Sequence, residues 1–411
     1  MPVLELLAVV LLVRAERRSW VPVAFWGTIA AASIAAAVWI AVQPGNMRDL
    51  HEVRTWIAFI RTSAANPYSY FDGQLDYPPV AFFVLSPLGW IPDAHLAQWF
   101  LPLSVATSAV AGWVLVQAMT HRAGVQLPVP QHASLVLLML STSAVRGGIW
   151  TGQTVAFSVL FGALALLWSP KQPFLAALAL ALCSFKPHVA VGFGLAILML
   201  DGLDVPMIAG AIMTSLSLLV SAALNQSVLA MVAEYVRNLF VMYDGPDHIR
   251  GLLSIRWVLE DLLGNYGLST LAYGLAATVS LVLIGQTARR ATNAAERAHV
   301  VAATLIWPLL FLPSQLYNGL MAAPALWLLM WPESGLIRQE ARRVAAVGLF
   351  VAFGVFDIPR VLRQASNLLS DGYWLYKGSY YLSPIRLALV FGFILLVALR
   401  RARPAGNEAN I

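Results

Sequence analysis

Residues 174–200 read FLAALALALCSFKPHVAVGFGLAILML and contain a single charged side chain, Lys186. An apolar run lies on either side of Lys186, and Pro187 interrupts any helix that would continue through both runs. A charge between two apolar segments is costly in a membrane unless it lies at the surface or is paired. The stretch therefore predicts two membrane helices that meet at a polar turn around Lys186.

The rest of the chain has the same character. Of its 411 residues, 59% are hydrophobic and only 11% are charged, and the mean hydropathy is +0.73. An ordinary soluble domain has roughly 25% charged residues, and a soluble fold of this length could not hide so much apolar surface. This composition excludes a soluble enzyme and a disordered chain. It predicts an all-α polytopic membrane protein with one integral membrane domain over 1–411.

A membrane helix needs about 20 apolar residues, or fewer where a segment is buried in protein. On this basis we predict about twelve spans, with interfacial helices and loops between them on the external side. The predicted spans are 20–43, 98–119, 132–150, 154–168, 174–185, 188–200, 205–224, 266–285, 298–313, 319–331, 344–356 and 384–399. The apolar run 1–13 is too short to span and is interpreted as a surface segment. The run 79–91, broken by Pro87, is interpreted as re-entrant or interfacial.

Short basic loops set the orientation, because cytoplasmic loops carry an excess of Lys and Arg. With twelve spans, the basic groups all fall on one side, which is then cytoplasmic. They are Arg14, Arg17 and Arg18; His121 and Arg122; Lys171; Arg289, Arg290 and Arg297; Arg338, Arg342 and Arg343; and Arg400, Arg401 and Arg403. The long connections 44–97, 225–265 and 357–383 are then external.

Several function classes are not supported by the sequence. The basic residues form only short groups, so we expect membrane lipid and no nucleic acid as a partner. Phosphate-binding glycine motifs are absent, which argues against an ATP-driven pump. The single cysteine, Cys183, excludes internal disulfides, and the seven histidines lack the H-x-x-x-H spacing of a zinc site. We therefore expect no metal and no cofactor.

The first external loop, 44–97, carries the most informative residues. Asp49 follows the first predicted span closely, and the stretch 50–61 alternates apolar and charged residues as an interfacial helix would. Within it stand Arg54 and Trp56. The strings Asn66-Pro67-Tyr68 and Asp76-Tyr77-Pro78-Pro79 are typical of turns. Asp49 has a structural alternative as the cap of a helix that begins near Leu50.

Taken in order, these strings resemble the first external loop of GT-C glycosyltransferases, which are membrane enzymes that use polyprenyl-phosphate sugars. The string Leu75-Asp76-Tyr77-Pro78-Pro79 looks like that of the dolichol-phosphate-glucose glucosyltransferases. The pattern Asn66-Pro67-Tyr68 followed by Tyr77-Pro78-Pro79 is similar to the bacterial polyprenol-phosphate-mannose α-mannosyltransferase and arabinofuranosyltransferase family. Gly152-Gln153 and Phe185-Lys186-Pro187 also fit this bacterial branch. The resemblance covers roughly residues 45–200.

The resemblance implies that Asp49 is the general base. An acceptor hydroxyl loses its proton as it attacks the anomeric carbon, and a carboxylate in reach can take that proton. The lipid phosphate is already a good leaving group, so a second, acidic carboxyl is not required as it is in glycosidases. Glu52, one turn later, is the alternative base.

Other polar residues near the external side are candidates for binding the donor phosphate or sugar. For Lys186, the alternative is a lysine that only extends its ammonium to the membrane surface. The set of donor candidates is Lys186, Arg54, Arg146, Gln153, His188 and Arg256.

The loops that follow are candidates for acceptor binding. Tyr68, Asp76 and Tyr77 lie in the first loop, and Tyr317 and Asn318 lie in the polar break 314–318 between two spans. Five aromatic residues in 357–383 form either a membrane-interface belt or a platform on which an acceptor sugar stacks. They are Tyr373, Trp374, Tyr376, Tyr380 and Tyr381.

The leading hypothesis is an inverting transferase in the bacterial inner membrane. It would move a sugar, with mannose favoured, from a polyprenyl-phosphate donor to a glycan or glycolipid acceptor on the extracytoplasmic face. Arabinofuranosyl or glucosyl transfer by the same mechanism is the nearest alternative. A secondary transporter or lipid flippase is the alternative from another class, although such proteins often show two similar halves and none is visible here. A scaffold role does not account for the ordered motifs.

Overall fold

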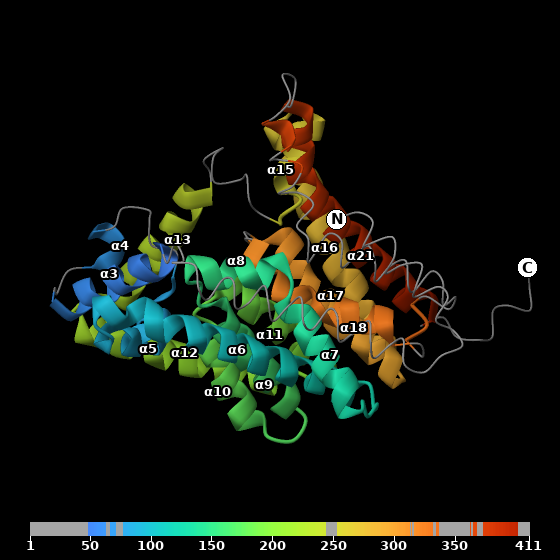
Figure 1. The fold of residues 1–411 in the computed structure, drawn as a ribbon, viewed down its shortest axis with the longest axis horizontal. Coiled ribbons are helices and arrows are strands. Elements are labelled where there is room, and N and C mark those ends of the chain that lie inside the picture. Colours follow the sequence, from blue (N-terminus) through green and yellow to red (C-terminus); the bar gives the residue numbers. More distant parts are fainter. Residues whose placement is uncertain are drawn as a thin grey trace, which may run out of the picture.

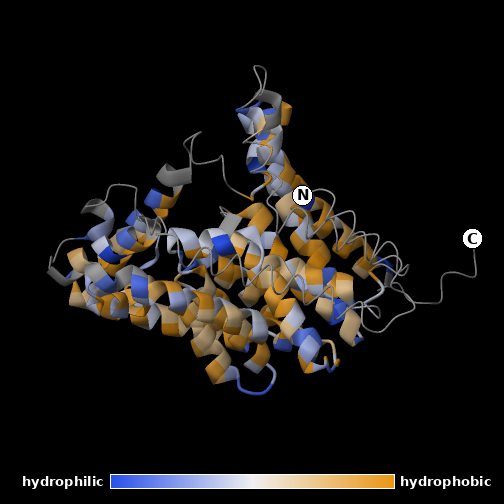
Figure 2. Cartoon of the chain, viewed as in Figure 1, coloured by the Kyte–Doolittle hydropathy of each residue, from blue (hydrophilic) through white to orange (hydrophobic). Residues whose placement is uncertain are grey.

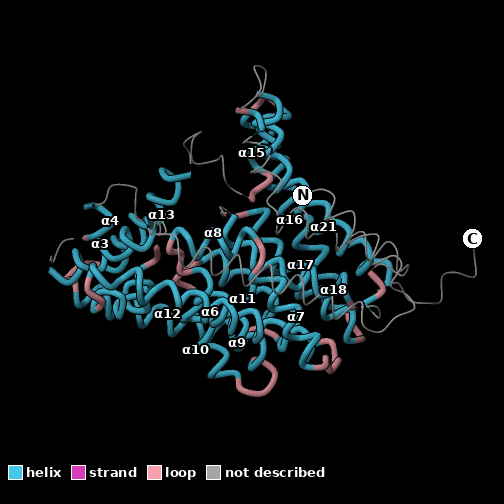
Figure 3. The backbone as a smooth tube through the Cα atoms, viewed as in Figure 1, coloured by secondary structure: helices cyan, strands magenta, loops and turns pink. Residues whose placement is uncertain are grey.

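The fold is seen in a computed structural model, which describes residues 48–62, 66–70, 77–243, 253–312, 314, 316–331, 334–336, 362, 365–367 and 373–401. Within these residues every regular element is a helix (Figure 1). Figure 3 shows the described chain as helices joined by short loops, without a strand. The predicted all-α membrane fold is therefore confirmed.

The helices follow one another closely along the chain. Those of the first half are α3 (Arg48–Thr62), α4 (Pro67–Tyr70), α5 (Pro79–Leu85), η2 (Ser86–Trp90), α6 (Asp93–Arg122), α7 (Val129–Leu140), α8 (Ser143–Thr151), α9 (Val155–Trp168), α10 (Pro173–Cys183) and α11 (Pro187–Asp201). Those of the second half are α12 (Asp204–Ala223), α13 (Val228–Tyr243), α15 (Arg256–Leu263), α16 (Tyr266–Arg290), α17 (Ala294–Phe311), η3 (Leu316–Ala322), α18 (Ala323–Met330) and α21 (Tyr373–Arg401).

Five of the described helices are long and apolar enough to cross a membrane, and a bent pair, α7 with α8, would make a sixth. The five are Gln98–Arg122, Asp204–Ala223, Tyr266–Arg290, Ala294–Phe311 and Tyr381–Arg400. Shorter apolar helices occupy the predicted spans 154–168, 174–185 and 188–200. The predicted spans 20–43 and 344–356, and the segment 1–13, lie outside the described residues. The total of twelve spans therefore stays a prediction.

The region predicted as one span over 132–150 is divided in the structure. Helices α7 and α8 meet at an angle of 59°. The hydroxyl groups of Ser141 and Thr142 donate to backbone carbonyls of the preceding turn, and the Thr142 Oγ1 also accepts from the Val145 amide at 3.5 Å. These side-chain bonds end one helix and cap the next. The run 79–91 forms α5 and η2, two short helices with Pro87 in the second.

Local sequence explains where many helices begin. Proline stands in the first turn of α5, α10 and α11, where its missing amide hydrogen costs nothing. Asn265 caps α16 by accepting from the Leu268 amide at 3.0 Å. Asn293 and Glu296 form a capping box at α17, in which each side chain accepts from the other's backbone.

Small residues allow the central helices to pack closely. A Cβ atom added at Gly162 of α9 would lie 2.1 Å from the Phe193 ring of α11. One added at Gly192 of α11 would lie 2.7 Å from Met321 and 3.1 Å from Pro308 of α17. Helix α17 is the most enclosed of the long helices, because 78% of its 18 residues are buried. It is therefore the centre of the core.

The turns predicted to be cytoplasmic meet at one end of the helix core. Arg122, at the end of α6, donates to Asp201 Oδ1 at the end of α11 and to Ser169 Oγ after α9, both at 2.6 Å. A Cβ atom at Gly124 would lie 3.8 Å from Ala294, where α17 begins. These contacts agree with the prediction that successive spans run in opposite directions through the membrane, so that every second turn lies at this end. In Figure 2 the helices of the core are mostly hydrophobic, and hydrophilic residues gather at turns and in the outlying helices.

Candidate functional site

The turn between α8 and α9 is at the opposite end from Arg122. Gly152 closes α8 with a φ of 78°, a left-handed conformation that glycine adopts without strain. The next amide, of Gln153, donates to Gly148 O at 2.8 Å. This turn places Gln153 and Thr154, both buried, at the N-terminus of α9.

Lys186 lies in a second turn at this end, between α10 and α11. It has an extended backbone and forms the N-cap of α11, and its carbonyl accepts from Val189 and Ala190. Its side chain is only 5% exposed. The Lys186 Nζ lies 4.1 Å from the centre of the Tyr77 ring, a cation–π contact. Among the described residues, no carboxylate forms an ion pair with Lys186.

Tyr77 joins the two turns to the first long loop, 44–97, which is predicted to be external. Its hydroxyl lies 3.3 Å from Thr154 Oγ1, and its carbonyl accepts from the Tyr68 hydroxyl at 2.6 Å. The Trp56 ring of α3 packs against it, with ring centres 5.4 Å apart. Tyr77, Tyr68 and Trp56 are all buried. The loop is therefore folded onto the helix core and presents the Tyr77 ring beneath the Lys186 ammonium.

Helix α13 holds the first loop from its other side. Its Asn238 donates to Tyr68 O at 3.3 Å, and its Glu234 accepts from Asn66 Nδ2 at 2.8 Å. The Tyr235 and Tyr68 rings lie 5.8 Å apart. Figure 1 shows α3, α4 and α13 grouped at one side of the core. This role of α13 was not predicted from the sequence, because about 170 residues separate these partners.

Two more predicted residues lie next to Lys186. His188 is on the first turn of α11, close enough for an electrostatic interaction with Lys186. Its ring faces Asn318 of η3. Helix η3 is brought close to α8 because Gly319 leaves room for Ala144, to which an added Cβ would approach within 2.9 Å. The side chain of Tyr317 is outside the described residues. The structure thus gathers Lys186, His188 and Asn318 from segments far apart in the sequence.

The predicted arginines Arg54 and Arg146 are half-buried, on α3 and α8 respectively. The two helices pack against each other. Both residues make interactions within the protein. Both arginines therefore belong to the same end of the molecule as Lys186.

Asp49 lies in the first turn of α3, but its side chain is outside the described residues, as is the whole of Asp76. The next residue, Leu50, is fully buried and clusters with Phe100 of α6 and Phe157 of α9. Phe157 lies one turn after Thr154 on α9. The start of α3 is thus anchored beside the helix whose N-terminus meets Tyr77.

Arg256 lies in a different cluster. In α15 it pairs with Glu260 at 2.8 Å and donates to the Tyr266 hydroxyl at 2.6 Å. Burial lowers the pKa of Arg256, but the hydrogen bond and charge of Glu260 raise it above its ordinary value. Nearby, Tyr381 stacks on Trp257 with ring centres 4.6 Å apart. Of the five predicted loop aromatics, only the Tyr381 side chain is described, and it packs within the protein.

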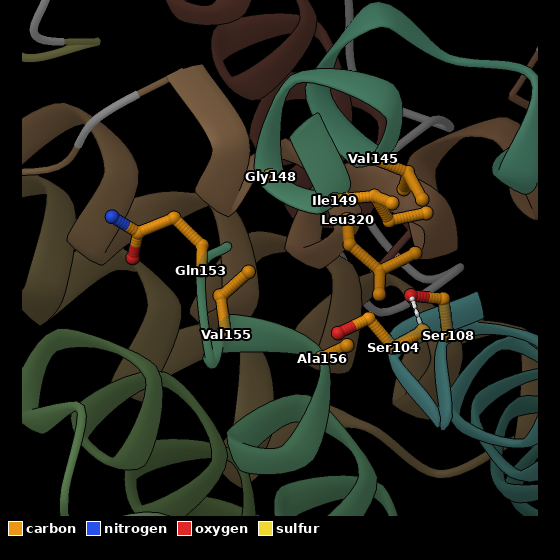
Figure 4. Close-up of a pocket in the computed structure, with 9 residues that line it drawn as sticks. All are labelled: Ser104, Ser108, Val145, Gly148, Ile149, Gln153, Val155, Ala156 and Leu320. Carbon is orange, nitrogen blue, oxygen red and sulfur yellow. Dashed lines mark hydrogen bonds between the residues drawn. The ribbon is translucent and has the colours of Figure 1, made fainter. Parts of the chain in front are cut away.

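A narrow cavity lies beside the first turn, between α6, α8, α9 and η3. It has a volume of about 10 Å³, room for about one water molecule. Figure 4 shows Ser104 and Ser108 at one side and the Gln153 amide pointing away from them. The cavity is too small for a sugar, so the predicted contact of Gln153 with a donor would have to lie outside it. Among the described residues, no three His, Cys, Asp or Glu side chains are grouped as metal ligands would be, and the absence of a metal stays a prediction.

Comparison with known proteins gives one family. The sequence model of glycosyltransferase family 87 matches residues 75–314, which is more than half of the chain. The match runs from the residue before Asp76 to Ser314, so it includes Tyr77, Lys186 and α13. No curated protein and no solved structure matches the chain.

Proposed function

The chain belongs to glycosyltransferase family 87, a family of GT-C type membrane enzymes, and on this premise we propose its donor, its acceptor and its base. The donor is a polyprenyl-phosphate sugar, with mannose first. The acceptor is a lipid-linked or polysaccharide glycan on the extracytoplasmic face of the bacterial inner membrane. Family membership favours this enzyme over the alternative of a secondary transporter or flippase.

The observation that carries the proposal is the setting of Lys186. A buried ammonium is costly unless an anion accompanies it. Tyr77 supplies an attraction of about 2 kcal/mol for a desolvated cation–π pair. A phosphate would supply the missing opposite charge. The N-termini of α11 at Lys186 and of α9 at Thr154 both lie against Tyr77, and the dipole of a helix favours an anion near its N-terminus.

Asp49 is the proposed base. The acceptor oxygen forms a bond to the anomeric carbon as the bond from that carbon to the phosphate oxygen breaks. The acceptor proton passes to the Asp49 carboxylate, and the lipid phosphate leaves with the electron pair. One displacement inverts the anomeric configuration, so a β-linked donor gives an α-linked product. The burial of Leu50 in a cluster with Phe100 and Phe157 supports this role, because it holds the first turn of α3 at the end of the core where α9 begins.

The test is a donor panel with purified protein in detergent or vesicles. Polyprenyl-phosphate mannose, arabinofuranose and glucose, each with a radiolabelled sugar, are incubated with the protein and with a membrane glycolipid extract as acceptor. Transfer or slow donor hydrolysis is scored, and Asp49→Asn protein is the blank. Mannose is expected to give the fastest reaction.

Each outcome has a defined meaning. Faster reaction with arabinofuranose or glucose would replace the sugar and keep the mechanism. Reaction with nucleotide-linked sugars and with none of the three lipid donors would overturn the proposed donor class.

A further inference from the structure

Helix α13 has two faces of different character. Its inner face carries Asn238 and Met231, which are buried against the first loop and its surroundings. Its outer face carries Leu229, Val232 and Val236, which are 79%, 41% and 42% exposed. The spacing of three and four residues puts these aliphatic side chains in one stripe along the helix. A stripe of this kind indicates a contact surface.

The position of α13 directly after a candidate span indicates what this surface contacts. Four residues separate the start of α13 from Ala223, the end of the candidate span α12. A helix of 20 residues is about 30 Å long, the thickness of the bilayer interior. The end of α12 therefore lies at the membrane surface, and so does the start of α13. The last turns of α12 also expose aliphatic side chains, Leu218 and Leu219, so exposed apolar residues occur on both sides of the connection between α12 and α13.

We infer that α13 lies along the bilayer surface with Leu229, Val232 and Val236 in the lipid. The exposed Arg237 borders this stripe, where its charge can reach lipid phosphate while its stem stays in the apolar layer. The partner is thus a phospholipid bilayer that contains anionic lipid. The inference uses only the fold and the membrane class, and it holds whichever sugar the enzyme transfers.

The arrangement links the membrane surface to the site. The inner face of α13 holds Tyr68, and Tyr68 in turn holds Tyr77 beneath Lys186. Helix α13 is then fixed in the lipid on one side and bound to the first loop on the other. It therefore sets the height of the Tyr77 ring above the bilayer. A substrate that remains anchored in the same bilayer needs a constant height of this kind.

The test measures how deep each face of α13 lies. The single Cys183 is buried, and Cys183→Ala provides a background for single cysteines at positions 229, 236 and 230. Ala230 is the matched control, because it is also exposed but points about 100° away from Leu229. Each cysteine is labelled with a nitroxide in full-length protein, in vesicles of phosphatidylcholine and phosphatidylglycerol. Collision rates are measured with oxygen, which concentrates in lipid, and with a nickel chelate, which stays in water.

Labels at 229 and 236 are expected to show an oxygen-to-nickel ratio at least several-fold above that at 230. Equal ratios with high nickel access at all three positions would overturn the inference, because the stripe would then face water. Low access to both reagents at 229 and 236 would overturn it as well, in favour of a protein partner. If mixing with unlabelled protein then sharpened the spectra, that partner would be a second copy of the chain.

Discussion

The two ends of the helix core each bury a cation, and the two cations have different partners. At one end, Arg122 has a side chain that is 7% exposed, and both of its terminal nitrogens bind Asp201, with Ser169 completing the group. At the other end, Lys186 is 5% exposed and has the Tyr77 ring beside it, without an ion pair among the described residues. A buried charge with its own counterion holds helices together. A buried charge without one is what the proposed binding of a donor phosphate requires.

The comparison makes a general prediction about the two ends. Changes at the Arg122 end should alter stability and leave catalysis per folded molecule intact. Changes at the Lys186 end should alter catalysis or donor binding and leave stability nearly intact. The substitutions below test this division from the largest expected effect to the smallest.

Asp49→Asn should give the largest effect. Loss of a general base lowers the rate by about 10²–10⁴-fold, and the melting temperature should not change, because the substitution keeps the shape of the side chain. The measurement is sugar transfer from the lipid donor, with thermal unfolding alongside. Glu52→Gln is the matched control and should retain activity. Turnover close to wild type in Asp49→Asn would rule out Asp49 as the base.

Arg122→Met should cost about 3 kcal/mol of unfolding free energy, because it leaves the Asp201 carboxylate, whose side chain is only 15% exposed, without its partner. The midpoint of unfolding in detergent is the measurement. The double variant Arg122→Met with Asp201→Leu should recover most of the loss, since two apolar side chains replace the whole pair. If the double variant were as unstable as the single one, the ion pair would not be the source of the effect.

Lys186→Met should weaken donor binding by about 10–100-fold, equivalent to one hydrogen bond with a charged group. The free energy of unfolding should stay the same or increase, because a buried charge is removed. The KM for the donor and the unfolding midpoint are measured together. Lys171→Met, at an exposed lysine in the turn between α9 and α10, is the control and should change neither. A loss of stability with unchanged donor affinity would make Lys186 a structural residue.

Asn238→Ala should weaken donor binding by only a few-fold, because one hydrogen bond to Tyr68 O contributes about 1 kcal/mol. The effect should appear in KM more than in kcat, since Asn238 acts through Tyr68 and Tyr77 and does not touch the donor. Asn238→Ser keeps a donor group and should retain more affinity than alanine. Identical behaviour of the two variants would point to packing as the cause.

Tyr77→Phe should have the smallest effect, below about 1 kcal/mol, because it keeps the ring under Lys186 and loses the long, 3.3 Å contact with Thr154. Tyr77→Leu removes the ring and should weaken donor binding more. The measurement is the donor KM of the two variants side by side. Equal losses in both would assign the contribution to the hydroxyl group and not to the cation–π contact.

Much of this site was readable from local patterns. Lys186 stood out because it interrupts a long apolar stretch, and Tyr77 because Pro78 and Pro79 follow it. The amphipathic pattern over 50–61 predicted a helix that the structure places at Arg48–Thr62. Thr154, Glu234 and Asn238 gave no such signal, because a threonine or an asparagine near an apolar run is common. The division of 132–150 was also missed, since Ser141 and Thr142 end a helix only through side-chain bonds that hydropathy does not register.

The sequence by itself determined the membrane class, the helical content and the short set of polar residues from which a site can be built. It did so because an apolar solvent requires every backbone group to bond within a helix and makes each charge costly, so composition and spacing carry the information. Only the tertiary structure decided which of these residues meet. The approach of Tyr77 to Lys186 and Thr154, and the support of Tyr68 by α13, depend on contacts between segments 77 to 170 residues apart. Side-chain packing sets such contacts, and a linear pattern does not contain them.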